Sequence, residues 1–317
     1  MKLKRRIVGV VGVGHVGAHV AFNLGMMGIA DEVRICDKNE QKVRSEAQDL
    51  NDAAPFMPNH TRYKEVDYAG LKDCDIIVNA VGNIALLETH DRDKELENSV
   101  KEVSSFIPKI MAAGFDGIFV NITNPCDVIT NLIREKSGLP SHRVVGTGTL
   151  LDSARLIHVI AAHTGLDARG FTAFMIGEHG NSQMAAWSCI SFYGKPLAEL
   201  AHTPQFSFTK DESQAKAIKG DWVTYVGKGC TEYGVASAGA TLVRTILRDE
   251  KRILPVSAYL QGEYGERGIY CGIPAIISAD GVEAVMEYHL TPEEQLEFKQ
   301  CCQAIRNNIA KSYDVLI

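Results

Sequence analysis

The chain has 317 residues, of which 23% are charged, and a formal net charge of −6 at pH 7. This length allows two lobes with a large buried core, and the acidic balance argues against nucleic acid or an anionic membrane as a partner. No apolar run reaches the roughly 18 residues of a membrane span, and eight cysteines without a C-x-x-C pair favour reduced thiols. We therefore expect a soluble, cytoplasmic protein. The basic start at residues 2–6 imitates a signal peptide, but glycines and polar side chains interrupt the apolar stretch behind it, which favours a first strand.

The first expected elements form a dinucleotide-binding pattern. A buried strand at 6–11 leads into Gly12-Val13-Gly14-His15-Val16-Gly17, a helix follows at 15–28, and a second strand at 33–37 ends at Asp37. The glycines let the backbone approach a pyrophosphate, the helix N-terminus favours its charge, and the acid can bind both ribose hydroxyls. Because an acid repels a 2′-phosphate, NAD is predicted rather than NADP. The alternative is a glycine-rich turn that binds nothing.

Strand and helix patterns continue to alternate through the first half. Further strands are expected at 62–66, 75–81, 117–122 and 143–146, with helices at 39–51, 92–113 and 126–137. This alternation predicts a doubly wound parallel (Rossmann) α/β sheet. The second half suggests a helix at 149–164, antiparallel-looking runs at 171–176 and 184–193, helical stretches at 211–227 and 230–249, strands at 253–260 and 271–277, and a C-terminal helix from 292. We expect an NAD-binding domain at 1–147 and an α+β substrate domain with antiparallel strands at 148–317.

Two short segments of the second half carry acid–base chemistry. His179 lies between glycines in Gly177-Glu-His-Gly-Asn-Ser-Gln183, where a ligand can approach closely. In Leu151-Asp-Ser-Ala-Arg155, Asp152 supplies a carboxylate for an imidazolium. Arg155 follows nearly one helical turn later and can bind a carboxylate in two places. A proton donor, its orienting acid and a substrate anchor are the parts needed to work on a small 2-oxo or 2-hydroxy acid.

The glycine turn, the acid at the end of the second strand and the acid–base segments occur in an order that is typical of one family of enzymes. The motifs concerned are Gly12–Gly17, Asp37, Thr123-Asn-Pro-Cys-Asp127, Gly146-Thr-Gly-Thr-Leu-Leu-Asp-Ser-Ala-Arg155 and Gly177-Glu-His-Gly180. Their order and spacing resemble the L-lactate/malate dehydrogenase superfamily over essentially the whole chain. Within it, Ala80-Val-Gly-Asn-Ile84 and Gly177–Gln183 look most like the L-2-hydroxyisocaproate dehydrogenase branch.

The resemblance implies roles for individual residues. NADH would deliver a hydride to the keto carbon while His179 gives its proton to the carbonyl oxygen, with Asp152 offsetting the cost of the buried imidazolium. Arg155 would bind the substrate carboxylate, Asn124 the reacting oxygen, and Arg92 would polarise the carbonyl as a loop closes. The implied cofactor-binding residues are Gly12, Gly14, Val16, Gly17, Asp37, Lys42, Tyr68, Gly82, Asn83, Asn121, Thr123 and Thr147.

Substrate choice should depend on the segment from Asn83 to Asp91, which is expected to fold over the substrate side chain. It contains no lysine or arginine for a second carboxylate, as malate dehydrogenase would need, and it lacks the glutamine typical of lactate enzymes. Instead it offers Leu86 among Ile84, Ala85 and Leu87, which favours a 2-oxoisocaproate-like substrate. Alternatively these residues only pack the loop, and the enzyme is an L-lactate dehydrogenase acting on pyruvate. A non-catalytic NAD-binding sensor would keep the glycines and lose the acid–base residues.

Further predictions concern the other pocket wall, partners and metals. The resemblance places Thr231 on the substrate pocket, and Asp221 is expected to be an exposed helical acid. It also implies a homodimer or homotetramer. Ile157 and Thr172 stand where relatives activated by fructose 1,6-bisphosphate carry an arginine and a histidine, so no such activation is expected. No HExxH or paired-cysteine pattern occurs, and we predict no metal site.

Overall fold

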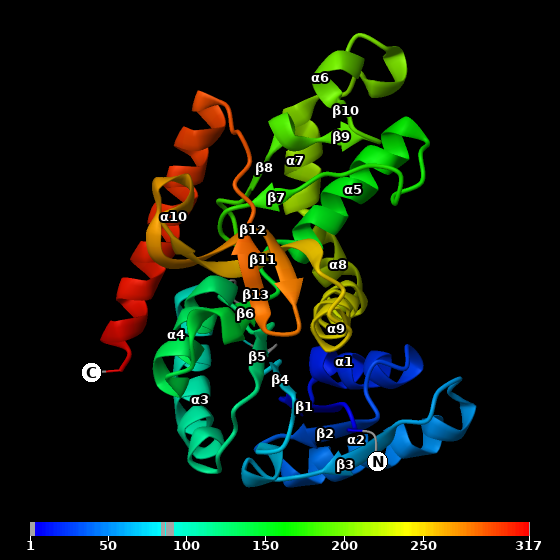
Figure 1. The fold of residues 1–317 in the computed structure, drawn as a ribbon, viewed down its shortest axis with the longest axis vertical. Coiled ribbons are helices and arrows are strands. Elements are labelled where there is room, and N and C mark those ends of the chain that lie inside the picture. The colour runs from blue at the N-terminus through cyan, green and yellow to red at the C-terminus, as the bar shows by residue number, and fades with distance from the viewer. Residues whose placement is uncertain (1–3, 84–85, 87–91, 317) are drawn as a thin grey trace.

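The computed structural model describes residues 4–83, 86 and 92–316, with the side chain of Arg92 left out. Nine strands within these ranges form one sheet at the centre of the molecule (Figure 1), in the order β13-β12-β11-β6-β5-β4-β1-β2-β3. The parallel part comprises β1 (Ile7–Val11), β2 (Glu32–Cys36), β3 (Arg62–Glu65), β4 (Ile76–Asn79), β5 (Ile118–Asn121) and β6 (Val144–Gly146). The predicted doubly wound parallel sheet is therefore confirmed.

Helices cover both faces of the parallel strands, which explains why β1, β4 and β5 are buried almost throughout. One face carries α1 (His15–Met26), α2 (Glu40–Ala53) and α9 (Tyr233–Leu247), and the other carries α3 (Arg92–Ala112) and α4 (Cys126–Ser137). The long C-terminal helix α10 (Pro292–Asp314) packs against α3, α4 and β12. No helix in the described ranges combines the length and the apolar character that a membrane crossing requires.

The strands of the second half extend the same sheet. These are β11 (Arg252–Gln261), β12 (Arg267–Ser278) and β13 (Gly281–Val285), which pair antiparallel. The connection to the parallel part is the pairing of Ser257 with Gly146. A Cβ atom at Gly146 would lie 2.7 Å from the Cβ of Ser257, so this junction needs small residues. The predicted boundary at 147/148 stays a prediction, and the sheet runs across it.

Several elements of the second half differ from those expected. The helical stretch at 211–227 is two helices, α7 (Lys210–Ile218) and α8 (Gly220–Lys228), because Lys219 has a ψ of −2° and ends the first. Strand β13 was not predicted. The run at 171–176 shortens to β7 (Met175–Ile176), and the run at 184–193 divides into β8 (Met184–Ala185) and β9 (Ser191–Phe192). The remaining elements are α5 (Leu150–Thr164), β10 (Lys195–Pro196) and α6 (Leu197–Leu200).

The topology brings the sequence motifs to one edge of the sheet. The chain leaves the carboxyl ends of β1, β2, β4, β5 and β6 at Gly12, Asp37, Ala80, Ile122 and Thr147. These ends lie along the same edge because the strands are parallel. The strand order reverses between β1 and β4, and in open α/β sheets this switch point is where ligands bind.

Candidate active site

The turn between β1 and α1 is shaped for a phosphate group. Gly12 has a φ of +86°, and a Cβ atom at Gly17 would lie 1.8 Å from the carbonyl oxygen of Gly12, so α1 packs directly on the turn. At Gly14, by contrast, a Cβ atom would meet nothing within 4 Å. Asp37 accepts a hydrogen bond from the N–H of Val13 (3.0 Å). The backbone is thus tight behind the turn and open in front of it, which fits the pyrophosphate of a dinucleotide.

A cavity of about 500 Å³ begins at this turn and runs to the second half of the chain. Most of the residues predicted to bind cofactor or substrate line it. They are Gly14, Val16, Lys42, Gly82, Asn83, Leu86, Thr123, Asn124, Thr147, Asp152, Arg155, His179 and Thr231. Gly12 and Gly17 lie behind the turn, and Asp37 lies beside it. The structure therefore brings the two groups of motifs, which are far apart in sequence, to one cavity.

Besides Gly12, Gly17 and Asp37, two further predicted cofactor residues, Asn121 and Tyr68, do not line this cavity. The side chain of Asn121 is fully buried and holds neighbouring segments together: it accepts from Asn79 Nδ2 (2.8 Å) and donates to the carbonyl oxygen of Cys126 (3.0 Å). The polar atoms of this side chain are already used within the protein, and a cofactor role for Asn121 stays a prediction. The ring of Tyr68 stacks on Phe106, with 5.6 Å between the ring centres. A cofactor role for Tyr68 stays a prediction.

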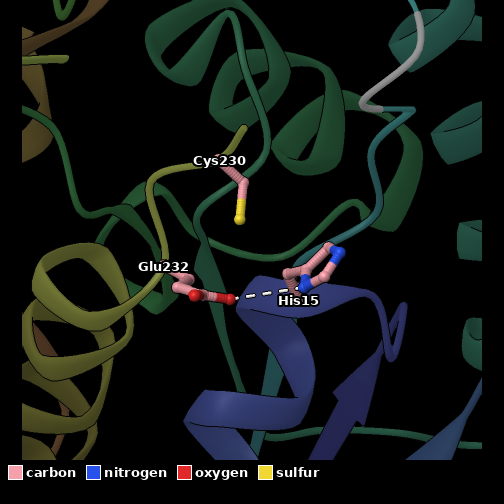
Figure 2. Close-up of side chains that lie close together, drawn as sticks. All are labelled: His15, Cys230 and Glu232. Carbon is pink, nitrogen blue, oxygen red and sulfur yellow. Dashed lines mark ion pairs between the residues drawn. The ribbon is translucent and has the colours of Figure 1, made fainter. Parts of the chain in front are cut away.

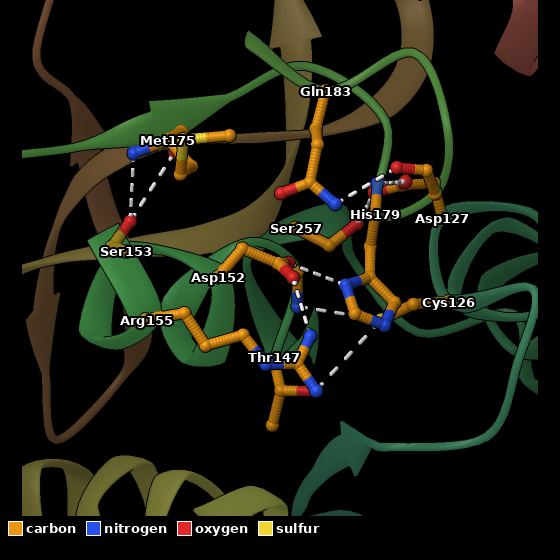
Figure 3. A network of polar contacts seen from close by, with 12 residues as sticks. Cys126, Asp127, Thr147, Asp152, Ser153, Arg155, Met175, His179, Gln183 and Ser257 are labelled. Atoms are coloured by element: carbon orange, nitrogen blue, oxygen red, sulfur yellow. Dashed lines mark hydrogen bonds and ion pairs between the residues drawn. The ribbon is translucent and has the colours of Figure 1, made fainter. Parts of the chain in front are cut away.

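His179 lies in the loop between the paired strands β7 and β8 (Figure 3). Gly177 opens this loop with a φ of +96°, and it exchanges two hydrogen bonds with Gly272 of β12, at 2.8 and 2.9 Å. A Cβ atom at Gly272 would lie 2.7 Å from the carbonyl oxygen of Gly177. Glycines on both sides are therefore required for this close approach, which fixes the loop to the central sheet.

The imidazole, carboxylate and guanidinium groups singled out in the sequence are in contact (Figure 3). His179 Nδ1 lies 2.5 Å from Asp152 Oδ2, and Arg155 Nη1 donates to the other carboxylate oxygen at 3.1 Å. Asp152 is fully buried in the first turn of α5. Burial alone would raise the pKa of Asp152, but the charge of His179 and its hydrogen bond lower it overall. Burial likewise opposes the charge of His179, but Asp152 raises the pKa of the imidazole overall.

A second buried carboxylate supports the backbone of His179. Asp127 Oδ2 accepts the N–H of His179 (2.9 Å), and Asp127 Oδ1 accepts the hydroxyl of Ser257 (2.5 Å). Burial raises the pKa of Asp127 to about 6, despite these two hydrogen bonds. Sequence reasoning quoted Asp127 within a motif but gave it no role. Its partner Ser257 lies far away in the sequence, and no local pattern pairs the two.

Two amide side chains on the cavity present polar atoms without a partner among the described residues. Asn124 Oδ1 and Gln183 Oε1 are buried and make no hydrogen bond with any described residue. The amide nitrogen of Gln183 donates to the carbonyl oxygen of Gly180 (2.8 Å), so this side chain also braces the histidine loop. An unsatisfied buried polar group costs about 1–3 kcal/mol. Both residues line the cavity, where a bound ligand can complete the missing hydrogen bond.

The substrate end of the cavity has an apolar wall. We use this term for Ile218, Trp222, Tyr225 and Val235, which come from α7, α8 and α9 and all line the cavity. The rings of Trp222 and Tyr225 stack, with 5.8 Å between their centres. Asp221 also lines the cavity, which corrects the expectation of an exposed helical acid.

Part of the predicted site lies outside the described residues. Arg92 begins α3, but its side chain is among the parts left out, as are Ile84, Ala85 and residues 87–91. Their roles stay predictions. Leu86 is described and lines the cavity.

Family models and relatives agree with this arrangement over the whole chain. The lactate/malate dehydrogenase NAD-binding domain matches residues 6–146, and the α/β C-terminal domain of the same family matches residues 149–315. The L-lactate dehydrogenase of Fusobacterium nucleatum is 38% identical over 99% of this chain and 100% of its own length. L-lactate dehydrogenase 1 of Bifidobacterium longum is 38% identical over 96% of this chain and 98% of its own.

Solved structures with the same architecture belong to the same group of enzymes. A minor L-lactate dehydrogenase from Enterococcus mundtii superimposes with a TM-score of 0.89 at 32% identity, covering 96% of this chain and 98% of its own. The malate dehydrogenase of Salinibacter ruber does so with a TM-score of 0.88 at 27% identity, covering 98% of both chains. The chain belongs to the lactate/malate dehydrogenase family and is an NAD-dependent oxidoreductase that acts on a CH–OH group.

Proposed function

We propose that this enzyme interconverts a 2-oxo acid that carries an apolar side chain larger than methyl, of the 2-oxoisocaproate kind, with its L-2-hydroxy acid. The observation that carries the proposal is the apolar wall, which shares one cavity with Arg155 and His179. The methyl group of pyruvate would leave most of this wall uncovered. Each further methylene group buried against it contributes about 0.8 kcal/mol.

The catalytic roles follow from the contacts of each side chain. Bound NADH supplies the hydride. Arg155 is fixed by Asp152 on one side and offers its planar guanidinium group to the substrate carboxylate, which lysine would not match. His179 uses Nδ1 for Asp152, and this leaves Nε2 to give a proton to the carbonyl oxygen. Asn124, whose amide oxygen lacks a partner among the described residues, can turn its amide group to donate to the same oxygen.

The test is a comparison of initial rates of NADH oxidation with pyruvate, 2-oxoisocaproate, phenylpyruvate and oxaloacetate. We expect kcat/KM for 2-oxoisocaproate or phenylpyruvate to exceed that for pyruvate by at least about tenfold, or about 1.4 kcal/mol. Oxaloacetate should be the poorest substrate, because Asp221 on the cavity would repel a second carboxylate. If pyruvate is the best substrate, the proposed side-chain preference is wrong.

A pair of neighbouring variants isolates the contribution of the apolar wall. Trp222 lines the cavity, whereas Val223 is 71% exposed and does not. Trp222→Ala should lower kcat/KM for 2-oxoisocaproate more than for pyruvate, and Val223→Ala should change neither. If Trp222→Ala lowered kcat/KM equally for both substrates, the apolar wall would not contribute to the preference for the substrate's side chain. His179→Asn should abolish turnover of every 2-oxo acid.

The second candidate is reduction of pyruvate to L-lactate. Its support is the activity named for the relatives described above: those from Fusobacterium nucleatum and Bifidobacterium longum, each 38% identical to this chain, are L-lactate dehydrogenases. In that case the apolar wall packs the closed site and contributes nothing to substrate choice. The same four-substrate comparison separates the two candidates, because they predict opposite orders for pyruvate and 2-oxoisocaproate.

A further inference from the structure

Three metal-ligating side chains meet where α1 faces the turn between α8 and α9 (Figure 2). His15 is the first residue of α1, and Cys230 and Glu232 belong to the turn. One imidazole nitrogen, the sulfur and one carboxylate oxygen all lie within 4.8 Å of one another. The residues come from opposite halves of the chain, and none of them has a part in the proposed proton or hydride transfer.

The distance between two of the candidate ligand atoms is compatible with a tetrahedral ion site. His15 Nδ1 lies 3.3 Å from Glu232 Oε2. Two ligands with zinc bonds of about 2.0–2.1 Å are about 3.4 Å apart in a tetrahedral site. The ammonium group of Lys228 contacts Glu232 Oε1, so the other carboxylate oxygen is left facing His15. In Figure 2 the sulfur of Cys230 points towards the gap between the imidazole and the carboxylate.

Burial and access also suit a metal ion. Cys230 and Glu232 are 8% and 7% exposed, so two of the ligands are held within the protein. The side chain of His15 is 63% exposed, and both His15 and Cys230 line the cavity, so an ion can enter from solvent. A site with three protein ligands keeps a fourth position for water.

We propose that His15, Cys230 and Glu232 bind a transition-metal ion of the zinc class. A thiolate, an imidazole and a carboxylate suit zinc and its neighbours, whereas calcium and magnesium prefer oxygen ligands throughout. On binding, the thiol of Cys230 loses its proton to solvent and the sulfur forms the metal bond. The ion would join α1 to the turn before α9, next to the glycine turn where the dinucleotide binds.

The competing interpretation is a network of ion pairs without metal. His19 Nδ1 also lies 3.5 Å from Glu232 Oε2, so two imidazoles and Lys228 surround one carboxylate. Such a network needs no thiolate. The role of Cys230 therefore distinguishes the two interpretations.

The experiment is a titration of the reduced, metal-free protein with Co²⁺, followed by Zn²⁺. We expect about one ion to bind per chain. A thiolate-to-cobalt charge-transfer band should appear in the near ultraviolet, together with the strong visible bands of tetrahedral cobalt. Added Zn²⁺ should remove both. The absence of a charge-transfer band would overturn the proposal, because cobalt bound elsewhere on the surface would not have a thiolate ligand.

Variants assign the signal to these residues. Cys230→Ser should remove the charge-transfer band, and His15→Asn and Glu232→Gln should each weaken cobalt binding at least about tenfold. The matched controls are Cys189→Ser, a partly exposed cysteine, and His60→Asn, an exposed histidine, which should bind as the parent does. A band that survives Cys230→Ser or disappears in Cys189→Ser would contradict the assignment. Circular dichroism of each variant checks that it is folded.

Discussion

Asp152 occupies a fully buried position between two positively charged side chains, and this explains how an imidazolium can exist in a closed site. Its carboxylate contacts His179 Nδ1 at 2.5 Å and Arg155 Nη1 at 3.1 Å. Burial alone would make both the carboxylate and the imidazolium unfavourable, and each is stabilised by the other. The pair should therefore titrate as a unit.

Asp152→Asn should lower kcat/KM for 2-oxo acid reduction by about 10²–10⁴-fold. Reduction needs the protonated imidazole, so kcat/KM falls as the pH rises through the pKa of His179. Asp152 raises that pKa, and its loss should move the falling limb of the profile to lower pH. The measurement is kcat/KM between about pH 5 and about pH 9. A falling limb at the same pH in both proteins would show that Asp152 does not hold the proton on His179.

Asp127 is expected to oppose folding at neutral pH. Its pKa is about 6 in the folded protein and 3.8 as the ordinary value. The protonated carboxyl is compatible with the folded state, so the ionised form costs stability. This cost is absent below about pH 3.8, grows as the pH rises between the two pKa values, and is complete above about pH 6. Asp127→Asn keeps the shape, accepts from the N–H of His179 and donates to Ser257. The variant should be more stable than the parent at pH 8, by about 3 kcal/mol at most, and by roughly half as much at pH 5.

Urea unfolding at about pH 5 and about pH 8 measures this difference. Asp280→Asn is the control, since Asp280 is exposed and the same substitution there should leave stability nearly unchanged at both pH values. A parent protein more stable than Asp127→Asn at pH 8 would mean that the ionised carboxylate is better satisfied than its burial suggests.

At the scale of an element, two glycines of the turn between β1 and α1 have different roles: Gly17 allows α1 to pack on the turn, and Gly14 leaves space for a ligand. Gly17→Ala places a Cβ atom 1.8 Å from the carbonyl oxygen of Gly12, so α1 must move away. We expect a loss of about 1–3 kcal/mol in stability together with weaker NADH binding. Gly14→Ala meets no protein atom within 4 Å. It should leave Tm nearly unchanged and weaken NADH binding at least about tenfold, about 1.4 kcal/mol.

Thermal unfolding and a fluorescence titration with NADH separate these two effects. Normal NADH binding by Gly14→Ala would mean that the pyrophosphate does not occupy the open space in front of the turn. Normal stability of Gly17→Ala would mean that the contact between α1 and the turn relaxes without strain.

Features that depend on residues close together in the chain were predictable from the sequence, and features that depend on contacts between distant segments were not. The strand, glycine turn and helix around Gly12–Gly17 are specified by adjacent residues. The Asp152–Arg155 pair lies within one helical turn, and His179 stands between glycines. In contrast, the contact of Asp127 with Ser257 and that of His15 with Glu232 join segments far apart in the chain. No spacing rule in the sequence predicts such pairs.

At the scale of the whole molecule, one sheet carries both halves of the site. Thr147, directly after β6, lines the cavity, and β11, paired to β6, supplies Ser257 to the carboxylate that accepts the N–H of His179. Strands at the positions of β11 and β12 were expected from the sequence, but β13 and the attachment to the parallel sheet were not. This attachment depends on the Gly146–Ser257 pairing, and a single small-residue contact leaves no visible pattern in the sequence.

No activation by fructose 1,6-bisphosphate is expected. Ile157 and Thr172 carry no charge, and Thr172 is paired through its backbone with Ser191. Neither position can attract a phosphate group. Saturation curves for the 2-oxo acid should be the same with and without the bisphosphate. A sigmoidal curve that becomes hyperbolic when the bisphosphate is added would contradict this prediction.

The anchoring of the histidine loop has a consequence for the rate of the reaction. The pair of hydrogen bonds between Gly177 and Gly272 and the contacts of His179 with Asp127 and Asp152 are all formed when the chain folds. The entropy of orienting the imidazole is therefore lost once, during folding, and not again in each turnover. The ring acts as an acid at a high effective concentration towards any carbonyl held by Arg155. What remains variable between substrates is the position of the carbonyl group, which the walls of the cavity determine.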